Sequence, residues 1–165
     1  MNNTNTVPSV LKNIGFTLLA EGKPIKVKAD GYSMYPAVKP GSIIYIEPFD
    51  ESTLLTPGDI IAWKRESGLV VHRLIRIASD KRATLYITRG DSCLNEDQPV
   101  TSYQIAGRVF RIENPGVKPV TESINKLKVI NYKINRLRVW FILKLKKIRR
   151  LLYYIYYPNP SKSIK

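Results

Sequence analysis

The segment from Ile25 to about residue 111 alternates short β-branched runs with turn dipeptides such as Pro40-Gly41, and this pattern does most to limit the possible folds. Valine, isoleucine, threonine and tyrosine favour strands, whereas Pro-Gly and Ser-Gly pairs favour turns. Strands are predicted over residues 25–29, 42–47, 59–65, 68–77, 84–89 and 103–111. Strands this short, joined by turns this tight, predict a mainly β, twisted and largely antiparallel domain.

Helical spacing flanks this β region on both sides. Residues 8–20 predict a short helix, with Pro8 in its first turn and Gly22 after its end. From about residue 123 the apolar positions return to three- and four-residue steps, which predicts a long amphipathic helix. Those positions are Ile130, Ile134, Leu137, Phe141, Leu145, Ile148, Leu152 and Ile155. We expect three parts: an N-terminal helix and lead-in over 1–24, a β domain over 25–116, and a basic C-terminal helix and tail over 117–165.

The positive charge is concentrated in the C-terminal part. The chain has 27 Lys+Arg against 13 Asp+Glu, a formal net charge of +14. Residues 123–165 hold twelve of the basic residues and no acidic ones, so the rest of the chain is close to neutral. This distribution predicts an anionic partner for the tail alone.

The composition of residues 124–157 fits a helix in the headgroup region of a membrane, because it combines an apolar stripe, many cations, Trp140 and a tyrosine cluster. No run approaches the roughly 20 apolar residues that span a bilayer, and residues 1–7 lack a secretory signal pattern. We expect a cytoplasmic or peripheral membrane protein whose tail binds an anionic membrane surface or a partner protein. The alternatives are packing on its own β domain and phosphate contacts to nucleic acid, although nothing indicates base readout.

The small numbers of cysteine and histidine residues limit the disulfides and metal sites that the chain can form. Cys93 is the only cysteine, so neither an intramolecular disulfide nor a paired-cysteine metal site is possible within the chain. His72 is the only histidine, so a histidine-rich zinc site is not expected. We expect neither a metal nor a cofactor, and we interpret Cys93 as a packing residue.

A serine, the histidine and two aspartates lie in separate short blocks, at Ser33, His72, Asp91 and Asp97. A serine hydroxyl needs a neighbouring base to attack a carbonyl, and imidazole suits that task near neutral pH. The pattern therefore predicts one hydrolytic centre that is assembled by folding. The alternatives are a turn-capping serine and a histidine that serves only in packing.

Five blocks follow one another along residues 25–112: Gly31–Pro36, Pro57–Ile61, Val71–Arg73, Gly90–Asp97 and Ala106–Val109. In this order they resemble the signal peptidase I superfamily, which also includes the self-cleaving peptidase domains of SOS and phage repressors. The resemblance implies a β peptidase domain of the signal-peptidase or repressor type. It also implies a serine endopeptidase that cleaves an extended segment of a precursor protein through an acyl-enzyme, with small side chains at the cleavage position.

The resemblance assigns roles to individual residues. Ser33 matches the nucleophile, and His72 matches the histidine base of the archaeal and endoplasmic-reticulum type. Asp91 and Asp97 both match acidic positions of the last conserved block. Asp97 is the better candidate to orient the imidazole, and Asp91 then braces the turn. Structural roles are expected for Arg73 and Gly90.

Four residues around Ser33 are expected to shape the substrate and oxyanion site: Gly31, Tyr32, Met34 and Pro36. Met34 is predicted to form an apolar floor of the peptide groove, and Pro36 to help present the turn. Signal peptidases usually have a hydroxyl residue where this chain has Gly31, and the repressor branch has glycine there. The oxyanion hole would then depend on backbone N–H groups, chiefly that of Ser33. A missing donor typically costs about 10²–10³ in turnover.

The resemblance does not extend to the family's targeting modules. The first 24 residues are too polar for a membrane anchor and too few for a helix-turn-helix domain. The alternative function is therefore a non-catalytic or self-processing regulatory protein of the repressor-peptidase branch.

Overall fold

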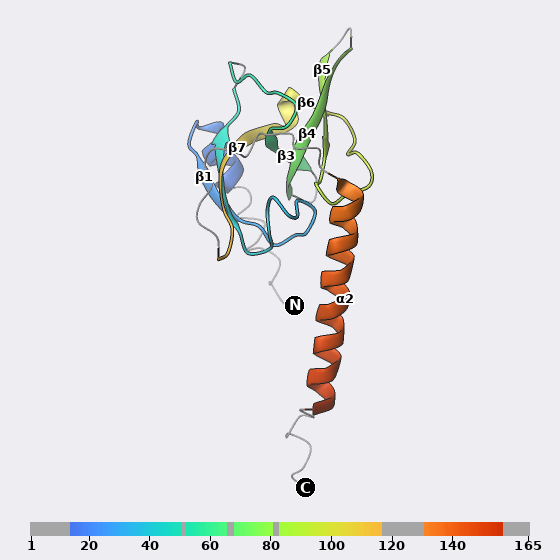
Figure 1. The fold of residues 1–165 in the computed structure, drawn as a ribbon. Coiled ribbons are helices and arrows are strands. Elements are labelled where there is room, and N and C mark those ends of the chain that lie inside the picture. The colour runs from blue at the N-terminus through green and yellow to red at the C-terminus, as the bar shows by residue number, and fades with distance from the viewer. Residues whose placement is uncertain (1–13, 51, 66–67, 81–82, 117–130, 157–165) are drawn as a thin grey trace, which may run out of the picture.

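The computed structural model describes residues 14–50, 52–65, 68–80, 83–116 and 131–156 (Figure 1). Residues 14–20 are helical, and the other elements follow in chain order. They are β1 (Ile25–Lys28), β2 (Ile43–Pro48), β3 (Ile60–Arg65), β4 (Gly68–Asp80), β5 (Ala83–Arg89), β6 (Val100–Thr101), η1 (Ser102–Gln104), β7 (Ile105–Glu113) and α2 (Tyr132–Tyr156). The predicted mainly β architecture with a short helix before it and a long helix after it is confirmed.

The seven strands form one sheet in the order β1-β2-β7-β3-β4-β5-β6, and every neighbouring pair is antiparallel. The last strand, β7, lies between β2 and β3, so it joins the two halves of the sheet. Strand β4 pairs with β3 from Gly68 to Arg73, but its pairing with β5 begins only at Arg73. Among the described residues, the first five residues of β4 therefore have a partner strand on one edge only.

The core consists of two apolar clusters, and strand β3 contributes to both. Ile60 and Ala62 belong to one cluster, whereas Ile61 and Trp63 belong to the other. Successive side chains of a strand point to opposite faces, so this strand is buried on both sides. Its sequence is accordingly a continuous apolar run rather than an alternation.

The strand boundaries differ from the sequence predictions by up to three residues; β4, for example, extends to Asp80 rather than to residue 77. The two-residue strand β6 was not predicted, because Val100–Thr101 is too short for any periodicity. The predicted strand over 103–111 begins instead at Ile105, since residues 102–104 form the 3-10 helix η1. Residues 8–13 of the predicted N-terminal helix lie outside the described residues.

The long helix α2 begins later than the periodicity suggested. Asn131 precedes it in non-helical conformation, and its Oδ1 accepts a hydrogen bond from the Ile134 N–H at 3.2 Å. This is an N-cap, which satisfies one of the donors that a helix start leaves free. The predicted positions before Asn131, and Pro158 after the helix, lie outside the described residues.

Figure 1 shows that α2 (orange to red) touches the β domain near its first turns and extends away from it. Asn135 and Val139 are its buried residues. The predicted apolar stripe is exposed along the described helix, with Leu137 at 55% and Leu145 at 58%. The helix thus contacts its own domain through Asn135 and Val139, but this stripe does not pack on the described part of that domain. No helix among the described residues is long and apolar enough to cross a bilayer.

Candidate functional site

Ser33 and His72 line the same cavity, which has a volume of about 380 Å³. Its walls come from residues 27–31, at the end of β1 and directly after it, and from residues 69–72 at the start of β4. Met34 also lines the cavity and is only 4% exposed, since it belongs to one of the core clusters. The serine and the histidine, far apart in sequence, thus share one partly enclosed space.

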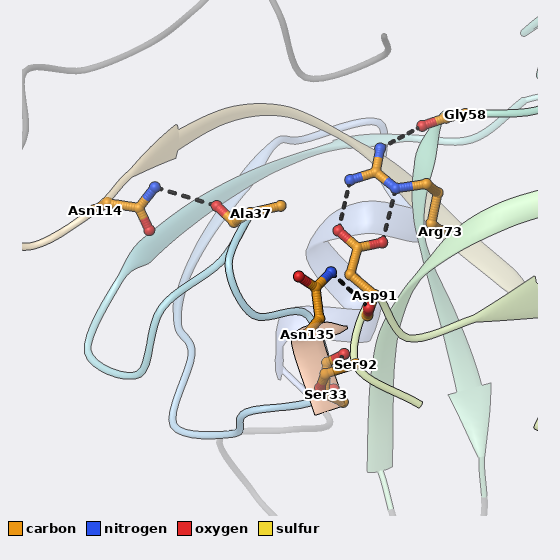
Figure 2. A network of polar contacts seen from close by, with 8 residues as sticks. All are labelled: Ser33, Ala37, Gly58, Arg73, Asp91, Ser92, Asn114 and Asn135. Atoms are coloured by element: carbon orange, nitrogen blue, oxygen red, sulfur yellow. Dashed lines mark hydrogen bonds and ion pairs between the residues drawn. The ribbon is translucent and has the colours of Figure 1, made fainter. Parts of the chain in front are cut away.

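The turn that carries Ser33 is tied to the loop after β5. The Ser92 hydroxyl donates to the Tyr32 carbonyl at 2.6 Å, and the Ser92 N–H donates to the Ser33 carbonyl at 2.9 Å. At the other end of the turn, Asn114 Nδ2 donates to the Ala37 carbonyl at 3.1 Å (Figure 2). These bonds fix the backbone on both sides of Ser33.

Gly90 lies where the Ser33 turn and His72 come closest. A Cβ at this position would lie 2.7 Å from the Ser33 carbonyl oxygen and 3.1 Å from His72 Nε2. Both distances are below ordinary van der Waals separation, so only glycine fits without displacing its neighbours. His72 Nε2 and the Ser33 backbone therefore approach each other around Gly90.

The other ring nitrogen of His72 contacts a carboxylate. His72 Nδ1 lies 2.6 Å from Asp97 Oδ2, and the Thr88 hydroxyl donates to the same oxygen at 2.7 Å. The Asp97 N–H donates to the Thr88 carbonyl at 2.8 Å, so the backbone also holds this aspartate against β5. Burial alone raises the pKa of Asp97, but the hydrogen bonds from His72 and Thr88 and the charges of His72 and Arg65 together lower it below its ordinary value.

The contact with Asp97 determines which ring nitrogen of His72 carries the hydrogen. An ionised carboxylate only accepts hydrogen bonds, so Nδ1 carries the hydrogen and Nε2 keeps its lone pair when the imidazole is neutral. Nε2 is the nitrogen that faces Gly90 and the Ser33 turn. Within the described residues, the Ser33 hydroxyl makes no hydrogen bond to His72. Catalytic hydrogen bonds are often longer or absent in sites without substrate.

Asp91 has a different partner. Arg73 Nε and Nη2 donate to its two carboxylate oxygens, each at 2.8 Å, and Arg73 Nη1 donates to the Gly58 carbonyl at 2.8 Å (Figure 2). Both side chains are 4% exposed, so this is a buried bidentate ion pair. Asp91 thus fixes the start of the loop that holds Ser33, while Asp97 is the aspartate that contacts the imidazole.

The remaining predicted residues lie around this centre. Gly31 lines the cavity and is exposed, and a Cβ there would meet nothing within 4 Å. Tyr32 and Pro36 are not among the described residues that line the cavity. Tyr32 contacts α2 instead, because its hydroxyl accepts a hydrogen bond from Lys146 Nζ at 2.5 Å. Pro36 is exposed and follows a cis peptide bond.

Sequence reasoning missed four residues that hold this centre in place: Thr88, Ser92, Asn114 and Asn135. Asn135 of α2 donates from Nδ2 to the Asp91 carbonyl at 3.0 Å, which ties the long helix to the site (Figure 2). Ser92 stands inside a recognised block, and its position beside Asp91 was a usable signal. Thr88 and Asn135 carry no such signal, because their partners depend on strand register and on helix docking.

Cys93 lies beside the site, but its thiol lacks the lowered pKa of a reactive cysteine. Burial raises the pKa of its thiol, and the negative charge of Asp97 raises it further. The thiol is therefore protonated at neutral pH, where the thiolate would be the reactive form. Among the described residues, no group of three histidine, cysteine, aspartate or glutamate side chains has a metal-binding arrangement.

Comparison with protein-family models finds no matching family, and comparison with curated proteins finds no matching relative.

Proposed function

We propose that this protein is a serine endopeptidase of the signal peptidase I type, with Ser33 as nucleophile, His72 as general base and Asp97 as the residue that orients the imidazole. One observation carries the proposal. The 2.6 Å contact between His72 Nδ1 and Asp97 Oδ2 leaves Nε2 as the basic nitrogen, on the side that faces the Ser33 turn. This is the division of roles that a serine–histidine–aspartate triad requires.

The reaction follows from that geometry. Ser33 Oγ attacks the scissile carbonyl carbon while its proton passes to His72 Nε2, and Asp97 stabilises the imidazolium that forms. The tetrahedral intermediate collapses when Nε2 gives the proton to the leaving amine, so the peptide C–N bond breaks and an acyl-enzyme remains. Water then attacks the ester carbonyl, with the same nitrogen as base, and releases Ser33.

The oxyanion would be stabilised by backbone donors, chiefly the Ser33 N–H. Gly31 has no side chain to offer a hydroxyl two residues before the nucleophile. Because one oxyanion donor is worth about 10²–10³ in turnover, we expect a slow enzyme. Slow turnover suits processing of a single precursor, where each substrate molecule is cut once.

The cavity lies between two open strand edges, which favours an extended peptide as substrate. Within the part of the chain that the structure describes, strand β1 is at the end of the sheet and residues 68–72 of β4 pair with β3 alone. Both edges offer free backbone groups to a bound strand. A second hollow of about 540 Å³ continues along β1 and shares Val27, Lys28 and Leu69 with the cavity. It is lined largely by apolar side chains, so we expect apolar residues in the bound segment.

An organophosphonate probe tests the nucleophile without knowledge of the substrate. The full chain should gain one adduct, located on Ser33 by peptide mass spectrometry. Ser33→Ala should remove the adduct, whereas Ser79→Ala, an exposed serine on β4, should not. His72→Gln should slow labelling, because the hydroxyl loses its base. Equal labelling of the wild type and Ser33→Ala would reject the assignment.

A regulatory protein that keeps the fold without turnover is the alternative. The observation that favours it is the missing hydrogen bond between Ser33 and His72 in the described structure. Self-processing has less support, because the sole Ala-Gly pair, Ala106-Gly107, is buried in β7 between β2 and β3. An unlabelled chain of unchanged mass after incubation with the probe and with a peptide library would favour the regulatory role.

A further inference from the structure

The helix α2 carries a continuous apolar stripe that its own domain does not cover. The stripe comprises Ile134, Leu137, Phe141, Leu145, Ile148, Leu152 and Ile155, and their exposed fractions are 47%, 55%, 53%, 58%, 52%, 46% and 63%. The domain contacts another side of the helix, where Asn135 and Val139 are 7% and 5% exposed. At 100° per residue these two sides are well separated around the helix axis.

Cations lie around the stripe along the whole helix, except Lys146, which lies on the side that faces the domain and bonds to the Tyr32 hydroxyl. The basic residues of α2 are Lys133, Arg136, Arg138, Lys144, Lys146, Lys147, Arg149 and Arg150, and no residue between Tyr132 and Tyr156 is acidic. Aromatic side chains are added to them: Trp140 is 50% exposed, and Tyr154 and Tyr156 near the helix end are 58% and 76% exposed. Apolar residues on one side, cations beside them and aromatics at the boundary are the features of a helix that lies in a membrane interface.

We propose that α2 binds the surface of an anionic phospholipid bilayer, with the stripe toward the acyl chains and the flanking cations among the headgroups. Charge complementarity favours an anionic bilayer over the other possible binding partners of α2. A second copy of the chain would bring two sets of cations together, and α2 has no carboxylate to pair with them. Nucleic acid would neutralise the cations but leave the stripe exposed to water. An anionic bilayer satisfies both the stripe and the cations.

This binding would also place the candidate site. The side of α2 that faces the domain contacts both loops of the site: Asn135 bonds to the Asp91 carbonyl at 3.0 Å, and Lys146 Nζ bonds to the Tyr32 hydroxyl at 2.5 Å. The Arg89 guanidinium, directly before Gly90, lies 4.2 Å from the centre of the Tyr132 ring. A membrane-bound α2 would thus hold the site at the bilayer surface, where a membrane-associated precursor would meet it. This consequence rests on the proposed function, but the binding does not.

Vesicle co-sedimentation of the full chain tests the proposal. Vesicles of phosphatidylcholine mixed with phosphatidylglycerol should sediment the protein, and vesicles of phosphatidylcholine alone should not. Trp140 emission should shift to shorter wavelength on binding, against the constant contribution of Trp63, which is 6% exposed. Equal binding to both kinds of vesicle, or to neither, would overturn the proposal.

Two matched variants separate insertion of the stripe from simple charge attraction. Leu145→Glu places a carboxylate in the stripe, whereas Leu143→Glu places the same charge on an exposed position of α2 outside the stripe. Leu145→Glu should weaken binding about tenfold or more, because it puts a charge among acyl chains, and Leu143→Glu should weaken it much less. Equal weakening would show charge attraction alone and overturn the proposed orientation.

Other results would show that α2 binds a second copy of the chain or nucleic acid. They would also separate the membrane proposal from the peptidase proposal. Without vesicle binding, a dimer that Leu145→Glu dissociates would assign the stripe to a second copy, and retention on double-stranded DNA would assign the cations to nucleic acid. Either result overturns the proposal. Ser33→Ala should bind vesicles like the wild type. Probe labelling at Ser33 without vesicle binding would reject only the membrane proposal, and the reverse result only the peptidase.

Discussion

His72 and Asp97 are joined by a 2.6 Å contact between Nδ1 and Oδ2, although they come from β4 and from the loop after β5. Thr88 completes the arrangement, because its hydroxyl and its carbonyl both bond to Asp97, at 2.7 Å and 2.8 Å. The aspartate is thus held by a side chain and by the backbone. The proposed function and two of the predictions depend on this carboxylate being fixed and ionised.

Asp97→Asn should reduce turnover while the fold persists. The amide has the same shape as the carboxylate but no charge, so it neither stabilises the imidazolium nor selects the Nδ1–H tautomer. Loss of this function typically costs about 10⁴ in turnover. The rate of Ser33 labelling by the phosphonate probe measures the effect, and circular dichroism checks the fold. An unchanged labelling rate would show that Asp97 is a structural residue only.

The lowered pKa of Asp97 predicts an acid-dependent loss of stability. In the unfolded chain this carboxyl titrates near its ordinary value of about 4, and in the folded protein it titrates at lower pH. The charged form is therefore favoured by folding. Its contribution to the free energy of unfolding is complete above about pH 5 and is lost as the pH falls through the folded pKa. Urea unfolding between pH 6 and pH 3, with buffers at about equal ionic strength, should show a smaller decline for Asp97→Asn than for the wild type.

The buried pair of Arg73 and Asp91 should stabilise the fold far more than a surface pair. Arg73→Met leaves a buried, uncompensated carboxylate, which should lower the free energy of unfolding by about 3–5 kcal/mol. The control is Arg76→Met, which removes the exposed contact of Arg76 to Glu96 at 3.0 Å and should cost less than about 1 kcal/mol. Urea midpoints at pH 7 compare the two variants. Similar losses would mean that the loop of the site does not depend on Asp91.

Gly90→Ala should disable the site through a steric clash. The new methyl group would lie 2.7 Å from the Ser33 carbonyl oxygen, which belongs to the backbone and cannot rotate away. A displacement of the nucleophile by about 1 Å typically costs about 10² in rate. Gly31→Ala makes the same chemical change at the cavity that Ser33 and His72 line, where nothing lies within 4 Å of the new methyl group, and should keep most of the activity. Full labelling of Gly90→Ala would contradict the close approach.

Gly31→Ser should accelerate the proposed cleavage reaction. The position has room for a side chain, and its φ is not in the left-handed region that favours glycine. A hydroxyl two residues before the nucleophile would supply the donor that signal peptidases usually have there, worth up to about 10² in turnover. Single-turnover cleavage of a peptide selected from a library measures the change, with Gly31→Ala as the control for volume. Equal rates for Gly31→Ser and Gly31→Ala would show that the oxyanion does not lie within reach of a side chain at position 31.

The sequence by itself determined the division into a β region with a helix on each side, and most strand positions. Side-chain burial leaves a local pattern in the sequence, so β3 was predictable from its continuous apolar run and α2 from its three- and four-residue steps. The short blocks around Ser33, His72 and Asp97 likewise predicted which residues form the candidate site. The two-residue strand β6 was not predicted, because two residues cannot show a period.

Only the tertiary structure decided which side chain each aspartate contacts and which face of α2 remains exposed. Asp91 and Asp97 lie in one short loop and have the same chemistry, so the sequence can only rank them. Their partners are set by the register of β4 against β5, which begins at Arg73 opposite Arg89, and by the path of the loop beyond it. The stripe of α2 was visible as a period, but its direction was not. Contacts between Asn135 and Asp91, distant in sequence, turn the helix so that the stripe faces away from the domain.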